Sequence, residues 1–153
     1  MNRWQNCFKQ SELWKYIKED SRASISVMGI ISEYDAFGWL QKYFGPNYLV
    51  EKNGPKEPDF TVTNLKTGEK KLVEFKRSKM DKFNFIKYHR DKEKVKYNRN
   101  FCDFVLVDRC DNTSTCAEYH LVPSSTIGTD PEEPNSLKGK VDVNNSVPMS
   151  KLF

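Results

Sequence analysis

Apolar and polar residues alternate along the middle of the chain in a way that predicts short β-strands. Residues 48–51 and 59–63 are two such segments, and in residues 71–77 the side chains of Glu74 and Lys76 point away from the face of their apolar neighbours. The sequence NLKTGE between the second and third segments is turn material with a glycine. We therefore expect residues 59–63 and 71–77 to pair as a hairpin.

Two further strands are expected near the end of this region. Residues 104–107 (FVLV) form a continuous apolar run, which is typical of a central strand covered on both faces. A polar loop then leads to a last strand over residues 118–122, which ends at Pro123.

An amphipathic helix is predicted ahead of the strands, with Ser32 as its N-cap and Gly45-Pro46 at its end. Four residues recur at the spacing of one helix face: Glu33, Phe37, Leu40 and Phe44. Glu33 either points toward the core, where a metal ion at its edge would compensate the charge, or faces water in a first helical turn. The pattern leaves both interpretations open.

The flanking regions are less regular. Residues 1–31 suggest a helical N-terminal region, although residues 20–29 read as β-rich or irregular, and residues 81–98 are highly charged and compatible with a helix. Residues 124–153 contain three prolines with many Asn and Ser, which predicts an irregular tail with at most one short strand near Val141. The expected order is an α/β mixed sheet flanked by helices.

Composition favours one globular domain over residues 1–153, with 37% hydrophobic and 30% charged residues. There is no apolar run long enough to span a membrane and no signal-peptide pattern, so we expect a cytoplasmic protein without a membrane partner. The net charge of +4 is uneven, because residues 66–100 contain 13 Lys or Arg against 5 Asp or Glu. Such a concentration is expected either of a polyanion-binding protein or of a solvated basic face.

The four cysteines form no CxxC pair. Cys110, Cys116 and His120 do not have the spacing of a common zinc site. Reduced thiols are the better interpretation for a cytosolic chain, and a Cys110–Cys116 disulfide stays open.

The hairpin carries the candidate chemistry. If pairing brings Asp59 beside Glu74 and Lys76, two carboxylates and an ammonium converge on one small volume. Two carboxylates with water are enough to hold Mg²⁺, and an ammonium nearby stabilises charge on a reacting phosphate. The alternative is an ordinary salt-bridged strand face behind a turn-terminating Asp.

Pro58-Asp59, fourteen residues, and then Glu74-Phe75-Lys76 resemble the motif of the PD-(D/E)xK nuclease superfamily, which has the restriction-endonuclease-like fold. The resemblance covers residues 32–123. It implies that Asp59 and Glu74 ligate Mg²⁺, with Mn²⁺ as a substitute, and that the backbone carbonyl of Phe75 is a further ligand. It also implies that Lys76 contacts the attacking water and the scissile phosphate. Glu33 matches the auxiliary acid of the first helix, with Asp35 as its substitute if the helix is rotated.

Basic residues after the motif are candidate phosphate contacts that would supply salt-dependent affinity without sequence information. They are Arg77, Lys79, Lys82, Lys87, Arg90, Lys94, Lys96 and Arg99. Aromatic residues between them fit core packing better than base stacking: Phe83, Phe85, Tyr88 and Tyr97. Base readout is expected from loops and from N-terminal donors: Arg3, Gln5, Asn6, Gln10 and Arg22.

The resemblance implies a metal-dependent endonuclease that cuts double-stranded DNA, most like a type II restriction endonuclease acting as a homodimer. A homing endonuclease, a Holliday-junction resolvase and an RNA endonuclease are alternatives of the same chemistry. If the chain is not a nuclease, the alternatives are a non-catalytic nucleic-acid-binding protein and a toxin-like or scaffold protein.

Overall fold

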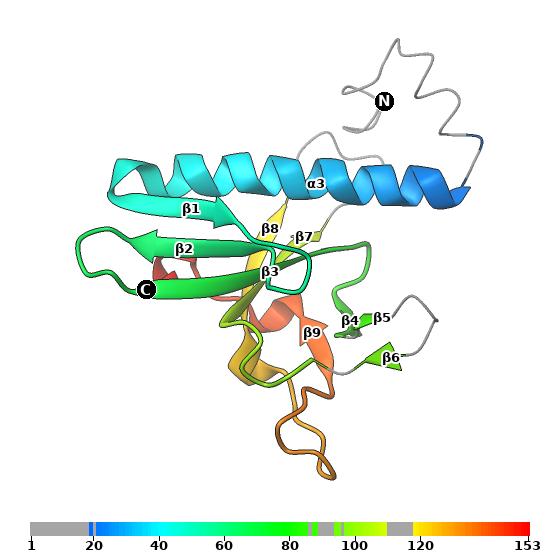
Figure 1. Cartoon of the computed structure of the whole chain (residues 1–153). Helices are drawn as coiled ribbons and strands as arrows, with labels where there is room; N and C mark the ends of the chain where they lie inside the picture. The colour runs from blue at the N-terminus through cyan, green and yellow to red at the C-terminus, as the bar shows by residue number, and fades with distance from the viewer. Residues whose placement is uncertain (1–18, 20, 86, 89–93, 96, 110–117) are drawn as a thin grey trace.

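The structure is a computed structural model that describes residues 19, 21–85, 87–88, 94–95, 97–109 and 118–153. A five-stranded mixed sheet in the order β1-β2-β3-β7-β8 lies beside one long helix, α3 (Figure 1). The sheet strands are β1 (Tyr48–Lys52), β2 (Phe60–Asn64), β3 (Lys70–Ser78), β7 (Phe104–Arg109) and β8 (Tyr119–Pro123). All five lie where the sequence predicts strands, β7 from its continuous apolar run, and the α/β class is confirmed.

The first three strands form an antiparallel meander, β7 runs parallel to β3, and β8 returns antiparallel to β7. The predicted hairpin joins β2 to β3 through a turn at which Gly68 has a φ of 74° and donates its N–H to the carbonyl of Asn64 at 2.7 Å. A positive φ is strained for residues with a Cβ, so a glycine suits this position. β3 is thereby the third of the five strands, paired on both sides.

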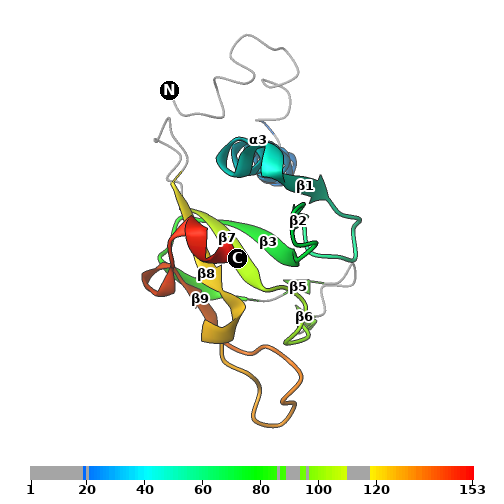
Figure 2. The same cartoon turned by 90° about the vertical axis from the view of Figure 1, so that its left-hand side faces the viewer.

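The sheet separates two hydrophobic clusters, because successive side chains of each strand point to opposite faces. The helix-side cluster includes Leu40 from α3 and Phe60, Val62, Val73, Phe75, Leu106 and Leu121 from the sheet. The far-side cluster includes Phe85, Tyr97, Cys102, Val105, Val107, Val122, Ile127, Leu137 and Val141. Figure 2 shows α3 on one side of the sheet, with β9 on the other.

Helix α3 (Ser21–Phe44) begins earlier than the predicted N-cap at Ser32, so that prediction is wrong. Ser32 is fully buried inside the helix and donates its hydroxyl to the carbonyl of Met28 at 2.7 Å, which satisfies the polar group without a cap. The predicted end is confirmed, because Phe44 is followed by Gly45 at a φ of 67°. In the described part of the chain, no helix is long and apolar enough to cross a membrane.

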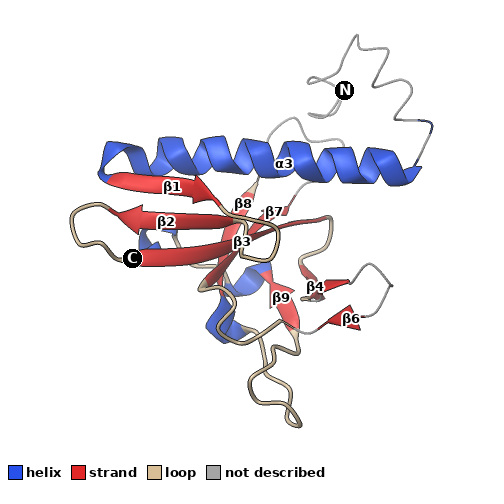
Figure 3. Cartoon of the chain, viewed as in Figure 1, coloured by secondary structure: helices blue, strands red, loops and turns tan. Residues whose placement is uncertain are grey.

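The helix expected over residues 81–98 is not formed in the part of that segment that the structure describes (Figure 3). Three short strands occur there: β4 (Lys82–Asn84), β5 (Lys87–Tyr88) and β6 (Lys94–Val95). β4 pairs with β9 (Lys140–Asp142), and Phe85 and Tyr97 enter the far-side cluster. Pairing with a distant strand overrides a weak local helix pattern.

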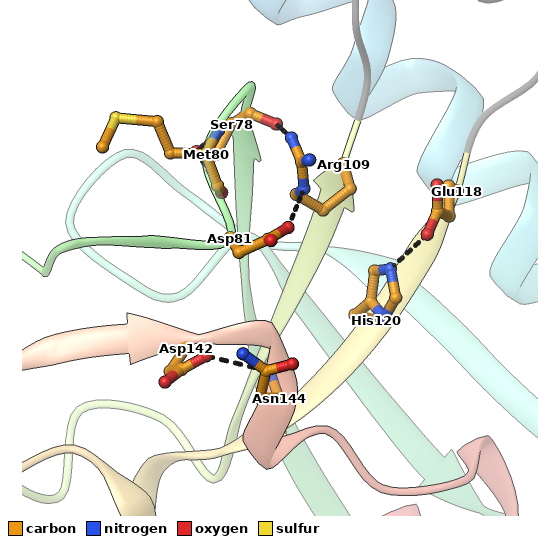
Figure 4. Close-up of polar contacts among 8 residues, drawn as sticks. All are labelled: Ser78, Met80, Asp81, Arg109, Glu118, His120, Asp142 and Asn144. Carbon is orange, nitrogen blue, oxygen red and sulfur yellow. Dashed lines mark hydrogen bonds and ion pairs between the residues drawn. The ribbon is translucent and has the colours of Figure 1, made fainter.

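The segment after β3 is tied back to the sheet by Arg109, the last residue of β7. Its Nε donates to Asp81 Oδ1 at 2.8 Å, and its Nη1 donates to the carbonyl of Ser78 at 3.3 Å (Figure 4). The chain therefore leaves β3 in a fixed direction, toward the far side of the sheet.

The C-terminal tail is irregular in conformation, as predicted, but it belongs to the core. It contains β9 and the 3₁₀ turns η2 (Ser124–Thr126), η3 (Val143–Asn145) and η4 (Met149–Leu152). Val147 donates its N–H to the carbonyl of Leu121 at 2.8 Å, and Leu152 is 1% exposed in the helix-side cluster. The tail thus closes the core beside the C-terminal end of α3, where Phe153 packs on Phe44 and Tyr48.

Leu152→Ala is expected to lower the free energy of unfolding by about 2–4 kcal/mol, because it leaves a cavity under a fully buried side chain. Urea denaturation of the two proteins measures the difference. Lys151→Ala is the control, because Lys151 is exposed in the same turn and its loss is expected to cost less than about 0.5 kcal/mol. Equal stability of Leu152→Ala and the parent would show that the tail does not contribute to the core.

Candidate active site

Asp59 stands directly before β2, at the end of a loop that is held in place by Asn53. The Asn53 N–H donates to the carbonyl of Asp59 at 2.9 Å, and its side-chain amide donates to the carbonyl of Pro58 at 2.8 Å. Pro58 is buried. These contacts fix the backbone of the Pro58-Asp59 pair, so the Asp59 carboxylate enters the hairpin in one direction.

The register of the hairpin brings Asp59 to β3. Phe60 is paired with Val73, so Asp59 lies next to Glu74 one step further along both strands. The Asp59 Oδ2 atom accepts a hydrogen bond from the backbone N–H of Phe75 at 2.8 Å. The predicted approach of Asp59 to the Glu74 strand segment is therefore confirmed.

Glu74 and Lys76 form an ion pair on the far side of the sheet, with 2.9 Å between Glu74 Oε1 and Lys76 Nζ. The Glu74 side chain is 8% exposed and that of Lys76 is 30% exposed. The alternative of an ordinary exposed salt bridge does not describe a carboxylate buried to this degree.

Tyr97 completes this group from the segment between β3 and β7. Lys76 Nζ donates to the Tyr97 hydroxyl at 3.1 Å, and that hydroxyl donates to Glu74 Oε1 at 3.3 Å. The sequence predicts Tyr97 as a core aromatic, which is confirmed, but it does not predict these polar contacts. Only its position in the basic, aromatic segment after the motif could have indicated them.

The two carboxylates raise the electrostatic energy of the site. The pKa of Asp59 is raised to about 6, mainly by burial and then by the negative charge of Glu74, with a smaller contribution from Glu33. The hydrogen bond from the Phe75 N–H and the charge of Lys76 oppose this rise. A divalent cation beside Asp59 would compensate the negative charge that opposes its ionisation.

Lys76 remains an ammonium at neutral pH. Burial lowers its pKa, but the charge of Glu74 and the interactions with Tyr97 outweigh burial and raise the pKa above its usual value. Lys76 therefore acts as a fixed positive charge and hydrogen-bond donor, not as a base that takes a proton from water. The pKa of Tyr97 is raised by burial, so its hydroxyl keeps its proton.

Glu33 lies in the middle of α3, not in a first turn. Its side chain is 23% exposed and forms an ion pair with Lys52 of β1 at 3.5 Å. Its charge still reaches Asp59, because it contributes to the raised pKa there. The alternative of a water-exposed first turn is wrong, and a role of Glu33 toward a metal ion stays a prediction.

The donor set fits Mg²⁺ with two protein ligands. In the described residues no group of three His, Cys, Asp or Glu side chains is placed to hold a metal ion, so Asp59 and Glu74 would bind it together with water. The hydrogen bond from Phe75 uses Asp59 Oδ2, and the contacts from Lys76 and Tyr97 use Glu74 Oε1. The role of the Phe75 carbonyl as a metal ligand stays a prediction. The described contact between Phe75 and Asp59 is made by the backbone N–H.

The predicted phosphate contacts are spread over several elements. Lys79 and Lys82 are exposed after β3, Arg77 is partly buried on β3, and Arg99 is exposed beside a groove described below. Lys87 and Lys94 belong to the two-stranded β5–β6 sheet. Some predicted contacts lie outside the described residues: Arg90, Lys96, Arg3, Gln5, Asn6 and Gln10.

A groove of about 530 Å³ opens at the starts of β3 and β7, on the far side of the sheet. Lys71, Arg99 and Asn100 line it, and Cys102 lies in its wall. Burial raises the pKa of the Cys102 thiol to about 11, with a further contribution from the charge of Glu74. Cys102 thus lies close enough to Glu74 for that charge to act on it, whereas Asp59, Glu74 and Lys76 are not among the residues that line the groove.

The structure bears on only part of the predictions made for the cysteines. Cys102 is buried and free, in line with the expected reduced thiols. Cys110 and Cys116 lie outside the described residues, and His120 pairs with Glu118 at 2.9 Å (Figure 4).

No protein-family model matches this chain, and a search of curated proteins finds no significant match. The interpretation of the site therefore depends on its geometry and on the motif.

Asp59→Asn is expected to stabilise the metal-free protein at pH 8. The raised pKa means that ionisation of Asp59 costs folding free energy above pH 6, and that this cost disappears below the unfolded value of 3.8. The shift corresponds to at most about 3 kcal/mol, and screening by solvent at a partly exposed carboxylate reduces this to about 1–2 kcal/mol. Asn retains an oxygen that accepts the Phe75 N–H.

Urea denaturation with EDTA at pH 8 and at pH 3.5 measures the gain, which is expected only at the higher pH. Glu51→Gln removes an exposed carboxylate from β1 and is expected to change stability by less than about 0.5 kcal/mol at either pH. A gain of equal size at both pH values would contradict the electrostatic explanation.

Proposed function

We propose that this chain is a Mg²⁺-dependent endonuclease that hydrolyses phosphodiester bonds in double-stranded DNA. The observation that carries the proposal is the convergence of Asp59, Glu74 and Lys76 at one point of the β2–β3 hairpin. Their identity and spacing resemble the PD-(D/E)xK motif, and the mixed sheet beside α3 supports the restriction-endonuclease-like fold. The absence of a helix in the described part of residues 81–98 departs from the expected pattern.

Each residue has a distinct task in this proposal. Asp59 and Glu74 hold the cation, which when bound supplies Lewis-acid activation of water and neutralises charge on the phosphate. Lys76 keeps its proton and stabilises the negative charge that builds on the phosphate oxygens. Glu33, paired with Lys52 at 3.5 Å, is the auxiliary acid in this proposal, and its negative charge acts on Asp59.

The groove at the starts of β3 and β7 supports binding of a polyanion. Lys71 and Arg99 bring positive charge to it against one carboxylate, Asp103, and Lys71 also pairs with Glu69 at 3.1 Å. Polar and basic contacts of this kind hold phosphates and sugars without reading base sequence. A DNA strand in this groove would lie beside Cys102, on which the charge of Glu74 acts.

Within this chemistry we favour a type II restriction endonuclease that acts as a homodimer, since two equivalent active sites can cut two antiparallel strands. The pattern of products separates the alternatives. Discrete fragments from long DNA indicate sequence recognition, and a smear indicates non-specific cleavage. Activity limited to branched DNA indicates a junction resolvase.

The first test is cleavage of supercoiled plasmid by the purified protein. Mg²⁺ or Mn²⁺ is expected to support cleavage, and EDTA is expected to abolish it. Glu74→Gln and Lys76→Ala are each expected to lower the cleavage rate roughly 100-fold or more, because each removes a charge from the reacting centre.

These variants are expected to keep their affinity for DNA, which a gel-shift assay in Ca²⁺ measures. Glu51→Gln is the matched control for loss of a carboxylate outside the site, with an unchanged cleavage rate. If wild-type protein binds DNA but never cuts it with either metal, the chain is a non-catalytic binding protein.

A second test concerns the groove. Arg99→Ala is expected to weaken DNA binding roughly equally for all sequences and to reduce the slope of log affinity against log salt concentration by about 1. Fluorescence anisotropy at several salt concentrations measures both effects. Lys151→Ala is the control, because η4 packs into the helix-side cluster, on the opposite face of the sheet. Equal effects of both substitutions would show that the groove has no special part in binding.

A further inference from the structure

Tyr97 comes from outside β3 and forms side-chain hydrogen bonds with both members of the Glu74–Lys76 pair. It is 5% exposed and its hydroxyl is both an acceptor and a donor. Lys76 Nζ donates to it, and it donates to Glu74 Oε1. With the direct Lys76–Glu74 contact, the three groups form a closed ring of hydrogen bonds that uses two of the three N–H groups of Lys76.

The ring of Tyr97 is held firmly, so its hydroxyl has a fixed position. It stacks on Phe85 with 4.3 Å between centroids and 15° between planes, and it contacts Phe101 at 4.7 Å. The Tyr97 carbonyl accepts the N–H of Leu137 at 2.7 Å, which fixes the backbone as well. Contacts with Phe85, Phe101 and Leu137 thereby determine where the hydroxyl lies.

Lys76, in contrast, carries its ammonium on a flexible chain with several rotatable bonds. Its side chain is 30% exposed, so water is an alternative partner for the ammonium. The Tyr97 hydroxyl at 3.1 Å and the face of its ring, 5.5 Å from Nζ, favour one orientation. Loss of the hydroxyl would leave the ion pair with Glu74 in place but remove the contact that selects this orientation.

We propose that Tyr97 is a positioning residue, which fixes the direction of the Lys76 ammonium and keeps its contact on one oxygen of Glu74. In this arrangement the hydrogen bonds from Lys76 and Tyr97 both go to the Oε1 atom of Glu74, and Oε2 is the atom we assign to the cation. The inference rests on the proposed nuclease function. It adds a residue that the motif does not include, and it gives the segment between β3 and β7 a part in the chemistry.

The test is Tyr97→Phe, which keeps the aromatic stack and removes only the hydroxyl. Its kcat for plasmid cleavage in Mg²⁺ is expected to fall roughly 10- to 100-fold, the usual effect of losing a group that orients an active-site residue. KM is expected to change less than about 2-fold, because Tyr97 is buried and does not contact DNA. Tyr43→Phe removes a hydroxyl from an exposed tyrosine of α3 and is expected to leave both constants unchanged.

A double-mutant cycle separates positioning from general support of the fold. If Tyr97 acts through Lys76, Tyr97→Phe has no further effect on kcat in a Lys76→Ala background, whereas independent effects multiply. Multiplied effects, or an unchanged kcat in the single variant, would overturn the inference while the proposed function stands. A wild-type protein that cuts no DNA overturns the proposed function, and the role of Tyr97 with it.

Discussion

Glu74 places a carboxylate, 8% exposed, on a strand that is paired on both sides. A buried charge of this kind is costly unless it is paired and hydrogen-bonded. Lys76 and Tyr97 provide those partners at 2.9 and 3.3 Å, and Tyr97 belongs to the far-side cluster. Removing either would leave Glu74 with an incompletely compensated charge, so the segment between β3 and β7 and the sheet depend on each other.

The second carboxylate, Asp59, has fewer compensating contacts than Glu74. Asp59 receives one backbone hydrogen bond from Phe75, and its nearest charges are mostly negative, so its pKa is raised to about 6. The fold therefore compensates Glu74 internally and leaves the charge of Asp59 less well compensated. This asymmetry is what a site that takes up a cation requires, because full compensation by the protein would remove the electrostatic reason for binding a metal ion.

Much of this arrangement follows from local sequence patterns. The alternation in residues 71–77 predicts that Glu74 and Lys76 share a face, and the turn at Gly68 predicts the hairpin that brings Asp59 to them. The start of α3 and the conformation of residues 81–98 were mispredicted. In the first case, Ser32 is a good cap by itself but satisfies its hydroxyl inside a longer helix. In the second, β4 pairs with β9 from the C-terminal tail, which a local pattern cannot reveal.

The sequence by itself determined the five strands of the main sheet, the hairpin and the two carboxylates with their lysine, because apolar patterning and turn chemistry are properties of neighbouring residues. Only the tertiary structure decided how deeply Glu74 is buried, that Glu33 pairs with Lys52, and that Tyr97 reaches the site. These features depend on contacts between segments far apart in the chain. Such contacts form only when the hydrophobic clusters on both faces of the sheet are packed together.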